Sequence, residues 1–309
     1  MAKIATREAY GKALAELVSE NENIVVLDAD LSGSTKSGMA KKVAPERHCN
    51  MGIAEGNMMS VAAGLAACGN TVFASSFAMF AVGRAYEQIR NSIGYPQLNV
   101  KICASHAGIS VGEDGASHQT FEDIALMRGI PGMKVICPCD AVEAEAAVKA
   151  VAAIEGPCFV RLGRSAVEVI HDENYHFEIG KADVLQEGQD VVILATGLEV
   201  QEAMKACESL KARGITPTLI NIHTIKPIDA ETIVRYAEKA KLIVTCEEHS
   251  IIGGLGSAVA EVLSEQCPRK LVRVGQRDVY GESGKPAELL HKYKMDSDAI
   301  VEAVVNNLK

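Results

Sequence analysis

The chain has no tryptophan, and aromatic residues of all kinds make up only 4% of its 309 positions. It also lacks an excess of positive charge, because 31 lysines and arginines stand against 40 aspartates and glutamates, for a formal net charge of −9. This balance argues against nucleic acid or an anionic membrane as the main partner. Small anionic ligands remain compatible with it, since a local pocket can be basic on an acidic protein.

Targeting segments and cysteine motifs are missing as well. No run of about 18 apolar residues occurs, and the first residues contain no signal-peptide core, so we expect a cytoplasmic protein. The nine cysteines are odd in number and lie mostly in apolar contexts, which predicts reduced thiols in the core. Cys137 and Cys139 are one residue apart, the wrong spacing for CxxC redox or zinc chemistry.

Two glycine-rich segments approach nucleotide-binding motifs and fail their patterns. Gly254 and Gly256 follow a strand-like run, but position 259 is valine where GxGxxG needs glycine, and the next run ends without a ribose-binding acid. Residues 281–286 lack the first glycine of a P-loop and end in proline. Both segments therefore predict tight turns.

Strand-like and helix-like segments alternate along the chain. Buried-strand runs such as Ile24–Leu27, Val100–Ala104 and Cys158–Arg161 are typical of parallel strands that are covered on both faces. A polar, irregular stretch at residues 165–188 interrupts the alternation, and a second series starts at Val191. We place the domain boundary near residues 165–185. The pattern predicts an α/β protein with two doubly wound domains, residues 1–167 and 180–309.

Two segments of the first domain carry residues suited to binding a flat heterocycle. Glu55 precedes a helix rich in alanine and glycine; it is either a partly buried carboxyl that can share a proton or an acid that favours the helix dipole. Phe77 and Phe80 are three residues apart after a strand-like run. One helical turn would put both rings on one face, either for stacking or for plain core packing.

A third segment, Ser105–Gln119, is a long polar loop that combines histidines, acids and glycines. In open α/β sheets ligands bind beyond the carboxyl ends of strands. A polar loop of this length is rarely only a connector. A catalytic metal is the main alternative to hydroxyl recognition and proton transfer, but the spacing indicates no third ligand, so no metal site is expected here.

In combination these motifs resemble the C-terminal half of transketolase, as found in split transketolases made of two chains. The resemblance covers essentially the whole chain and implies a thiamine-diphosphate pyrimidine-binding domain followed by a transketolase C-terminal α/β domain. The matching motifs are Gly52–Glu55, Ser76–Phe80, Ser105-His106 with Gly112–Gln119, Lys226–Asp229, Glu247–His249 and Gly253–Gly256.

The resemblance implies roles on the cofactor side. Glu55 matches the acid that stabilises the imino form of the cofactor's aminopyrimidine. Ile53 matches the apolar residue that wedges the cofactor into its bent shape, and Phe77 and Phe80 match residues that hold the pyrimidine ring. Asp30 matches a further acid on the cofactor side.

Substrates in this family are sugar phosphates, and two groups of residues match their contacts. The residues at the substrate hydroxyls and reacting carbonyl are His106, Asp114 and His118. The residues at the phosphate are Arg7, Ser34 and Arg164. Arginine suits a phosphate because its planar fork binds two oxygens at once. For Arg164 a surface salt bridge is the plain alternative, with Arg161 as the other candidate.

The resemblance also implies a missing half. The metal-binding signature of the family's other thiamine domain needs Gly-Asp-Gly, but Glu113 precedes Asp114-Gly115 here. We therefore expect a partner, the transketolase N-terminal subunit, that binds the diphosphate through Mg²⁺ or another divalent cation. The expected enzyme is a two-plus-two heterotetramer that transfers a two-carbon ketol unit between sugar phosphates.

Three other functions share part of the pattern. Deoxyxylulose-phosphate synthase has similar motifs but carries both thiamine domains in one long chain, which a 309-residue chain starting at Met1 does not fit. The beta subunit of a 2-oxo-acid dehydrogenase first component typically reads His-Ser-Gln where this chain has Ser117-His118-Gln119. A non-catalytic paralogue would lose Glu55 or the histidines, which are present. The donor and acceptor sugars and the pathway stay open.

Overall fold

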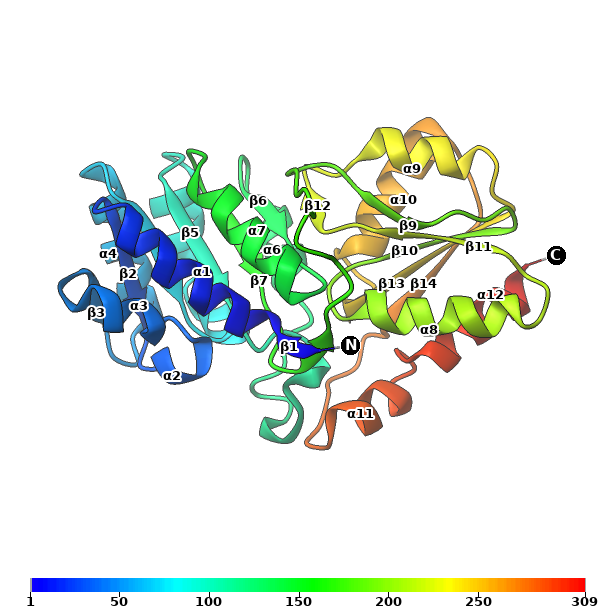
Figure 1. The fold of residues 1–309 in the computed structure, drawn as a ribbon, viewed down its shortest axis with the longest axis horizontal. Helices are drawn as coiled ribbons and strands as arrows, with labels where there is room; N and C mark the ends of the chain where they lie inside the picture. Colours follow the sequence, from blue (N-terminus) through cyan, green and yellow to red (C-terminus); the bar gives the residue numbers. More distant parts are fainter. Residues whose placement is uncertain (1, 309) are drawn as a thin grey trace.

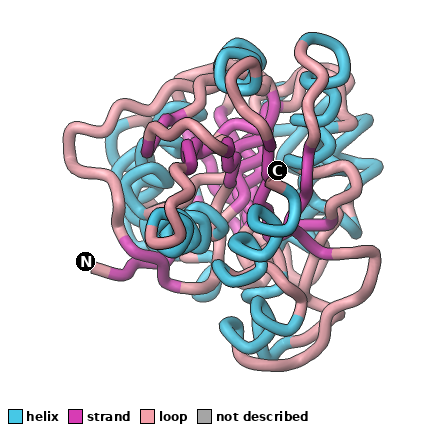
Figure 2. The backbone as a smooth tube through the Cα atoms, turned by 90° about the vertical axis from the view of Figure 1, so that its right-hand side faces the viewer, coloured by secondary structure: helices cyan, strands magenta, loops and turns pink. Residues whose placement is uncertain are grey.

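The computed structural model describes residues 2–308. Two sheets lie side by side along the long axis of the molecule, and helices cover both faces of each (Figure 1). The view along that axis shows the strands as an inner layer between helices (Figure 2). No helix among the described residues combines the length and apolar character needed to cross a membrane.

The first sheet has seven strands in the order β12-β6-β7-β5-β4-β2-β3. All neighbouring pairs are parallel except β12 with β6, which is antiparallel. The strands are β2 (Ile24–Asp28), β3 (His48–Asn50), β4 (Thr71–Ser75), β5 (Val100–Ala104), β6 (Lys134–Ile136), β7 (Cys158–Arg161) and β12 (Thr224–Lys226).

Helices cover this sheet on both faces because its strands are apolar on both. Successive side chains of a strand point to opposite faces, and Val72 and Phe73 accordingly belong to two different apolar clusters. One cluster joins the sheet to α4, and the other joins it to α1 and α7. The helical segments of this part are α1 (Thr6–Glu20), α2 (Ser32–Thr35), α3 (Gly38–Val43), the 3₁₀ turn Pro45–Arg47, α4 (Glu55–Ala67), α5 (Tyr86–Gln88), the 3₁₀ segment Ile109–Asp114, α6 (Asp123–Arg128) and α7 (Ala141–Ala152).

The sequence of residues 80–94 predicts one helix, but this stretch is not one regular α-helix. Two π-helical segments, Met79–Arg84 and Ile89–Gly94, flank the short α5. A π turn accommodates an extra residue and is frequent at functional sites. The apolar spacing alone does not distinguish it from an α-helix, which is why the sequence predicted one continuous helix.

The second sheet has five strands in the order β14-β13-β10-β11-β9. Three of its four strand pairings are parallel, and that of β9 with β11 is antiparallel. The elements are β9 (Asp183–Gln186), β10 (Val191–Ala195), α8 (Glu199–Lys211), β11 (Pro217–Asn221), α9 (Ala230–Ala237), β13 (Leu242–Ser250), α10 (Leu255–Gln266), β14 (Leu271–Gln276), α11 (Pro286–Lys292) and α12 (Ser297–Asn307). The predicted α/β fold with two doubly wound sheets is confirmed.

The stretch between the two series is less irregular than the sequence indicates. β8 (Ala166–Glu168) pairs with β1 (Lys3–Ala5) in a separate two-stranded sheet, and β9 forms an edge of the second sheet. β12 lies beyond this stretch in sequence yet joins the first sheet. Strands of three or four residues show no readable alternation, so their distant partners define them.

The cysteine prediction is correct for seven of the nine residues, which are buried. It is wrong for Cys49 and Cys68, which are exposed, because they lie at a short edge strand and just after the end of α4. All nine thiols are free.

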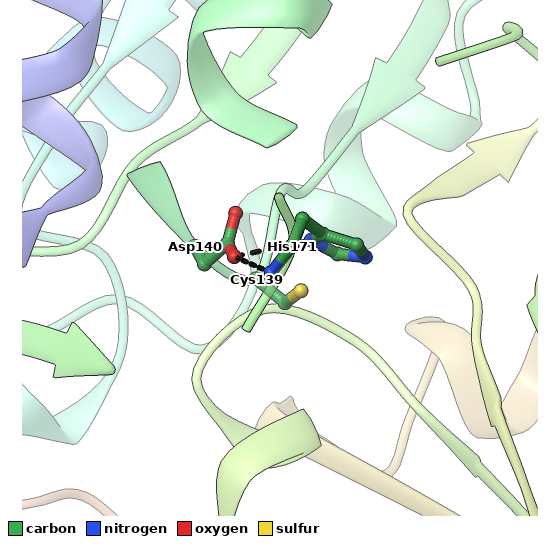
Figure 3. Close-up of side chains that lie close together, drawn as sticks. All are labelled: Cys139, Asp140 and His171. Atoms are coloured by element: carbon green, nitrogen blue, oxygen red, sulfur yellow. Dashed lines mark hydrogen bonds and ion pairs between the residues drawn. The ribbon is translucent and has the colours of Figure 1, made fainter. Parts of the chain in front are cut away.

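The connecting stretch is held in place by the buried Asp140 and by His171, whose side chain is 7% exposed. Asp140 caps α7 and also accepts the backbone N–H groups of Ile170 and His171, both at 2.8 Å. The His171 ring lies 3.1 Å from Asp140 Oδ2 through Nδ1 and 2.9 Å from Asp183 Oδ2 through Nε2. Figure 3 shows the ring beside Asp140 and Cys139. Although these three side chains are close enough to hold a metal, both ring nitrogens face carboxylate oxygens, which accounts for the arrangement.

We expect His171 to make stability depend on pH. Burial by itself lowers the pKa of His171, but the contacts with the carboxylates of Asp140 and Asp183 outweigh it and raise the pKa to about 10. The unfolded value is about 6.5, so the contribution is complete below that pH and is lost as pH rises towards 10. Urea unfolding between these limits should show a falling free energy of unfolding, with a shallower fall in His171→Gln. Equal slopes in both proteins would contradict this assignment.

Candidate active site

The predicted site residues follow successive strands of the first sheet at its carboxyl edge. Asp30 follows β2, Glu55 follows β3, Phe77 follows β4, His106 follows β5 and Arg164 follows β7. Neighbouring strands are about 4.8 Å apart, so the ends of β3 and β7, four strands apart in this sheet, are separated by roughly 19 Å. The edge is therefore long enough for an extended ligand with Glu55 at one end and Arg164 at the other.

Glu55 is a buried carboxyl with an unused oxygen. It is the first residue of α4 and is 2% exposed, and its Oε2 accepts no hydrogen bond within the described chain. Arg84, in the first π-helical segment, places Nη1 3.6 Å from this oxygen, while its own side chain is largely exposed. A buried acceptor without a hydrogen bond costs about 1–3 kcal/mol. The geometry thus suits a donor that comes from outside the described chain.

Asp30 and the turn before Glu55 are joined by Asn50. The Asn50 side chain accepts the N–H groups of Asp30 at 3.0 Å and Gly52 at 2.9 Å, and donates to Asp30 Oδ1 at 2.8 Å. Gly52 has a φ of 70°, which glycine adopts without strain. The turn leaves Ile53 74% exposed. The apolar side chain of Ile53 is thus exposed two residues before Glu55. The role of Asn50 was not predicted, because it lies in a strand of only three residues.

Phe77, Phe80, His106 and His118 form one aromatic cluster. Phe77 stacks on His106 with ring centroids 3.8 Å apart and on Phe80 at 5.9 Å. His118 meets the edge of Phe80 at 5.1 Å. A β-bridge between Phe77 and Ser105 continues the pairing of β4 with β5 and brings the rings together. The cluster combines apolar ring faces with two titratable nitrogen heterocycles.

His106 is held as a neutral ring. Its Nδ1 lies 2.8 Å from Ser105 Oγ and its Nε2 lies 3.3 Å from Arg7 Nη1. Because a guanidinium only donates, Nε2 accepts, which leaves the proton on Nδ1. Burial, and then the charges of Arg7 and Arg164, lower the pKa of His106 to about 3. At neutral pH the ring therefore carries no positive charge, and its acceptor nitrogen is used by Arg7.

Two guanidinium groups border this histidine. Arg7 donates to the carbonyl of Ser34 at 2.7 Å, which brings the N-terminal helix and α2 to the site. Arg164 donates to the carbonyl of Val111 at 2.7 Å and pairs with Glu113 at 3.0 Å, with its side chain 36% exposed. The alternative, Arg161, is 5% exposed and paired with the buried Asp123 at 2.6 Å. Of the two arginines, only Arg164 is accessible to a ligand.

Asp114 does not join the aromatic cluster. It ends the 3₁₀ segment Ile109–Asp114 and is exposed. The second domain holds the loop around it, because Ser283 donates to the carbonyl of Glu113 at 2.6 Å and the Gln119 amide donates to that of Glu282 at 2.9 Å. In Figure 1 this loop lies next to α11. No sequence pattern connects segments this far apart, so these contacts were not predicted.

Comparison with known proteins identifies the family. Residues 2–169 match the transketolase pyrimidine-binding domain, and residues 180–300 match the transketolase C-terminal domain. The chain belongs to the transketolase family. The resemblance predicted from the motifs, to the C-terminal half of a split transketolase, is thereby confirmed.

Similar proteins include separate transketolase subunits. A solved structure of a split-gene transketolase, described as an inactive β4 tetramer, is 55% identical with a TM-score of 0.92, covering 99% of this chain and 98% of that one. A protein of Methanocaldococcus jannaschii that is named as a transketolase C-terminal section is 52% identical, and the match covers 98% of this chain and 96% of that protein. The 6-deoxy-6-sulfo-D-fructose transketolase subunit SqwH of a Clostridium species is 43% identical, and the match covers 96% of this chain and 92% of that protein.

Proposed function

We propose that this chain is the C-terminal subunit of a two-chain transketolase, which transfers a two-carbon ketol unit between sugar phosphates with thiamine diphosphate as cofactor. The observation that carries the proposal is Glu55, a buried carboxyl with an unused oxygen at the same sheet edge as Phe77 and His106. Membership of the transketolase family supports the class of reaction.

The residues at this edge fit the pyrimidine end of the cofactor. Glu55 Oε2 accepts no hydrogen bond within the described chain and can accept one from a protonated ring nitrogen. Phe77 and Phe80 supply stacked ring faces, and the exposed Ile53 supplies an apolar contact in front of Glu55. When bound, thiamine diphosphate supplies the carbanion that carries the ketol unit. The Glu55 carboxyl oxygen would accept the hydrogen bond of the ring nitrogen, and the apolar contacts would orient the ring.

The neighbouring polar groups suit a sugar phosphate. The neutral His106, whose Nε2 accepts from Arg7, and His118 supply imidazole rings to the aromatic cluster. Arg7 and Arg164 place two positive charges beside them, which suits an anionic terminal group. Asp114 and Ser34 lie on the flanking loop and helix as further contacts.

The same arginines would also suit a sulfonate. The similar SqwH subunit is named for 6-deoxy-6-sulfo-D-fructose, and a sulfonate offers three oxygens in nearly the geometry of a phosphate. A sulfosugar is therefore the second candidate substrate, and comparing turnover of both sugars by one purified complex distinguishes them.

The diphosphate end and its metal belong to a partner subunit in this proposal. Within residues 2–308 two groups of side chains are close enough to share a metal: Cys139, Asp140 and His171, and His291, Asp296 and Asp298. None of these follows the strands that carry the candidate site. The inactive β4 tetramer of the similar split-gene transketolase supports the need for a second kind of chain. We infer a two-plus-two heterotetramer with a transketolase N-terminal subunit.

Glu55→Gln tests the cofactor role directly. In the complex with the partner subunit we expect turnover to fall about 10²–10⁴-fold, the usual range for loss of an acid–base group. Proton exchange at the thiazolium carbon, followed by NMR, should slow in parallel. Glu87→Gln, an exposed acid on α5, should exchange at the wild-type rate. A wild-type exchange rate in Glu55→Gln would remove this residue from cofactor activation.

Arg164→Ala tests the substrate class. Loss of a charged hydrogen bond of about 1.5–3 kcal/mol should raise KM for a sugar phosphate roughly tenfold or more. KM for hydroxypyruvate, which has no phosphate, should change little. The exposed Arg90 serves as the control for loss of a positive charge. Equal damage with both substrates would place Arg164 outside the phosphate site.

A further inference from the structure

An acid of the second domain reaches the loop that carries the candidate substrate residues. Glu248 lies on β13 and is 4% exposed, and its Oε1 accepts the backbone N–H of Ser110 at 2.5 Å. These two residues are 138 positions apart in sequence. Ser110 lies between His106 and Asp114, so the contact falls inside the segment that the proposed substrate would meet.

The loop is shaped to admit this carboxylate. Gly108 has a φ of 78°, and a Cβ atom at that position would lie 2.4 Å from Glu248 Cδ. A side chain there would collide with the carboxylate, so glycine is required both for the backbone conformation and for the close approach. The N–H of Gly108 bonds to the carbonyl of Thr120 at 3.1 Å and closes the loop at its base.

The Ser110 backbone is where several contacts of the site meet. The carbonyl of Ser110 accepts a hydrogen bond from Ser165 at 3.3 Å, and the next carbonyl, that of Val111, accepts the one from Arg164 at 2.7 Å. A displaced Ser110 amide would therefore shift the partner of Arg164 as well as the approach to Asp114.

Glu248 is itself fixed on its strand. Arg161 donates to its backbone carbonyl at 2.9 Å. Burial raises the pKa of Glu248, against the opposing charge of Arg161 and the bonds to Ser110. The preceding acid, Glu247, points to the other face of β13 and accepts the N–H groups of Leu255 and Gly256 at 2.6 and 2.8 Å. Glu248 therefore binds the loop, whereas Glu247 binds the start of α10.

We propose that Glu248 is a positioning residue of the active site, which holds the substrate loop through its acceptor oxygen. The proposal rests on the proposed function, since it assigns the second domain a part in that same reaction. It makes the C-terminal domain necessary for the geometry of the site as well as for its stability. What the loop needs is an oxygen acceptor at this position, with or without its charge.

Two variants separate the acceptor from its charge. Glu248→Leu removes the acceptor at similar size, while Glu248→Gln keeps an oxygen acceptor without the charge. In the complex with the partner subunit we expect kcat for Glu248→Leu to fall about tenfold to hundredfold, since a displacement near 1 Å can cost that much. Glu248→Gln should keep most of the activity. Cofactor affinity should stay at the wild-type value in both variants, because Glu55, Phe77 and Phe80 lie on other segments.

Hydrogen exchange of residues 107–115, measured by mass spectrometry, reports on the loop without relying on activity. It should accelerate in Glu248→Leu and stay slow in Glu248→Gln. Glu247→Leu is the matched control: it should lower the melting temperature without accelerating exchange in the loop. Wild-type exchange or kcat in Glu248→Leu, or equal damage from leucine and glutamine, would overturn the proposal. A wild-type complex without ketol transfer would contradict the proposed function instead, and the exchange result would still decide whether Glu248 holds the loop.

Discussion

The parallel order of the first sheet is the constraint on which the site depends. Because β3, β2, β4, β5 and β7 run in the same direction, the segments that follow them all emerge at one edge. The strand order alone thus brings residues from five separate stretches of sequence into one row. Apolar side chains on both faces of these strands pack against the covering helices and anchor the strands. The loops at the edge lie outside this core and can carry polar groups.

Contacts with the second domain complete what the sheet edge begins. The buried pair of Arg161 and Asp123 lies beneath the edge, and Arg161 also binds the backbone of β13. From that strand Glu248 reaches the substrate loop, and Ser283 reaches the same loop from beyond β14. An ion pair this deeply buried adds little net stability, but removing either partner would leave a buried charge without compensation. Side chains of the second domain therefore hold the loop of the proposed site.

Much of the fold and part of the candidate site could be predicted from the sequence, and the features that were not predicted have physical reasons. Buried parallel strands such as Val100–Ala104 read directly as apolar runs, and the motif around Glu55 indicated the family. The π-helical segments could not be predicted, because their apolar spacing is that of a distorted α-helix. β12 depends on a partner in the other domain. Arg84, Asn50 and Glu248 act through contacts with residues distant in sequence, which one chain without its fold does not reveal.

In the proposed enzyme this chain holds the pyrimidine half of a thiamine diphosphate site and needs a partner for the other half. The most direct measurement is ketol transfer between sugar phosphates by the purified chain with thiamine diphosphate and Mg²⁺, before and after addition of a transketolase N-terminal subunit. The account predicts no turnover from the chain alone and turnover on mixing. Full turnover by the chain alone would contradict it.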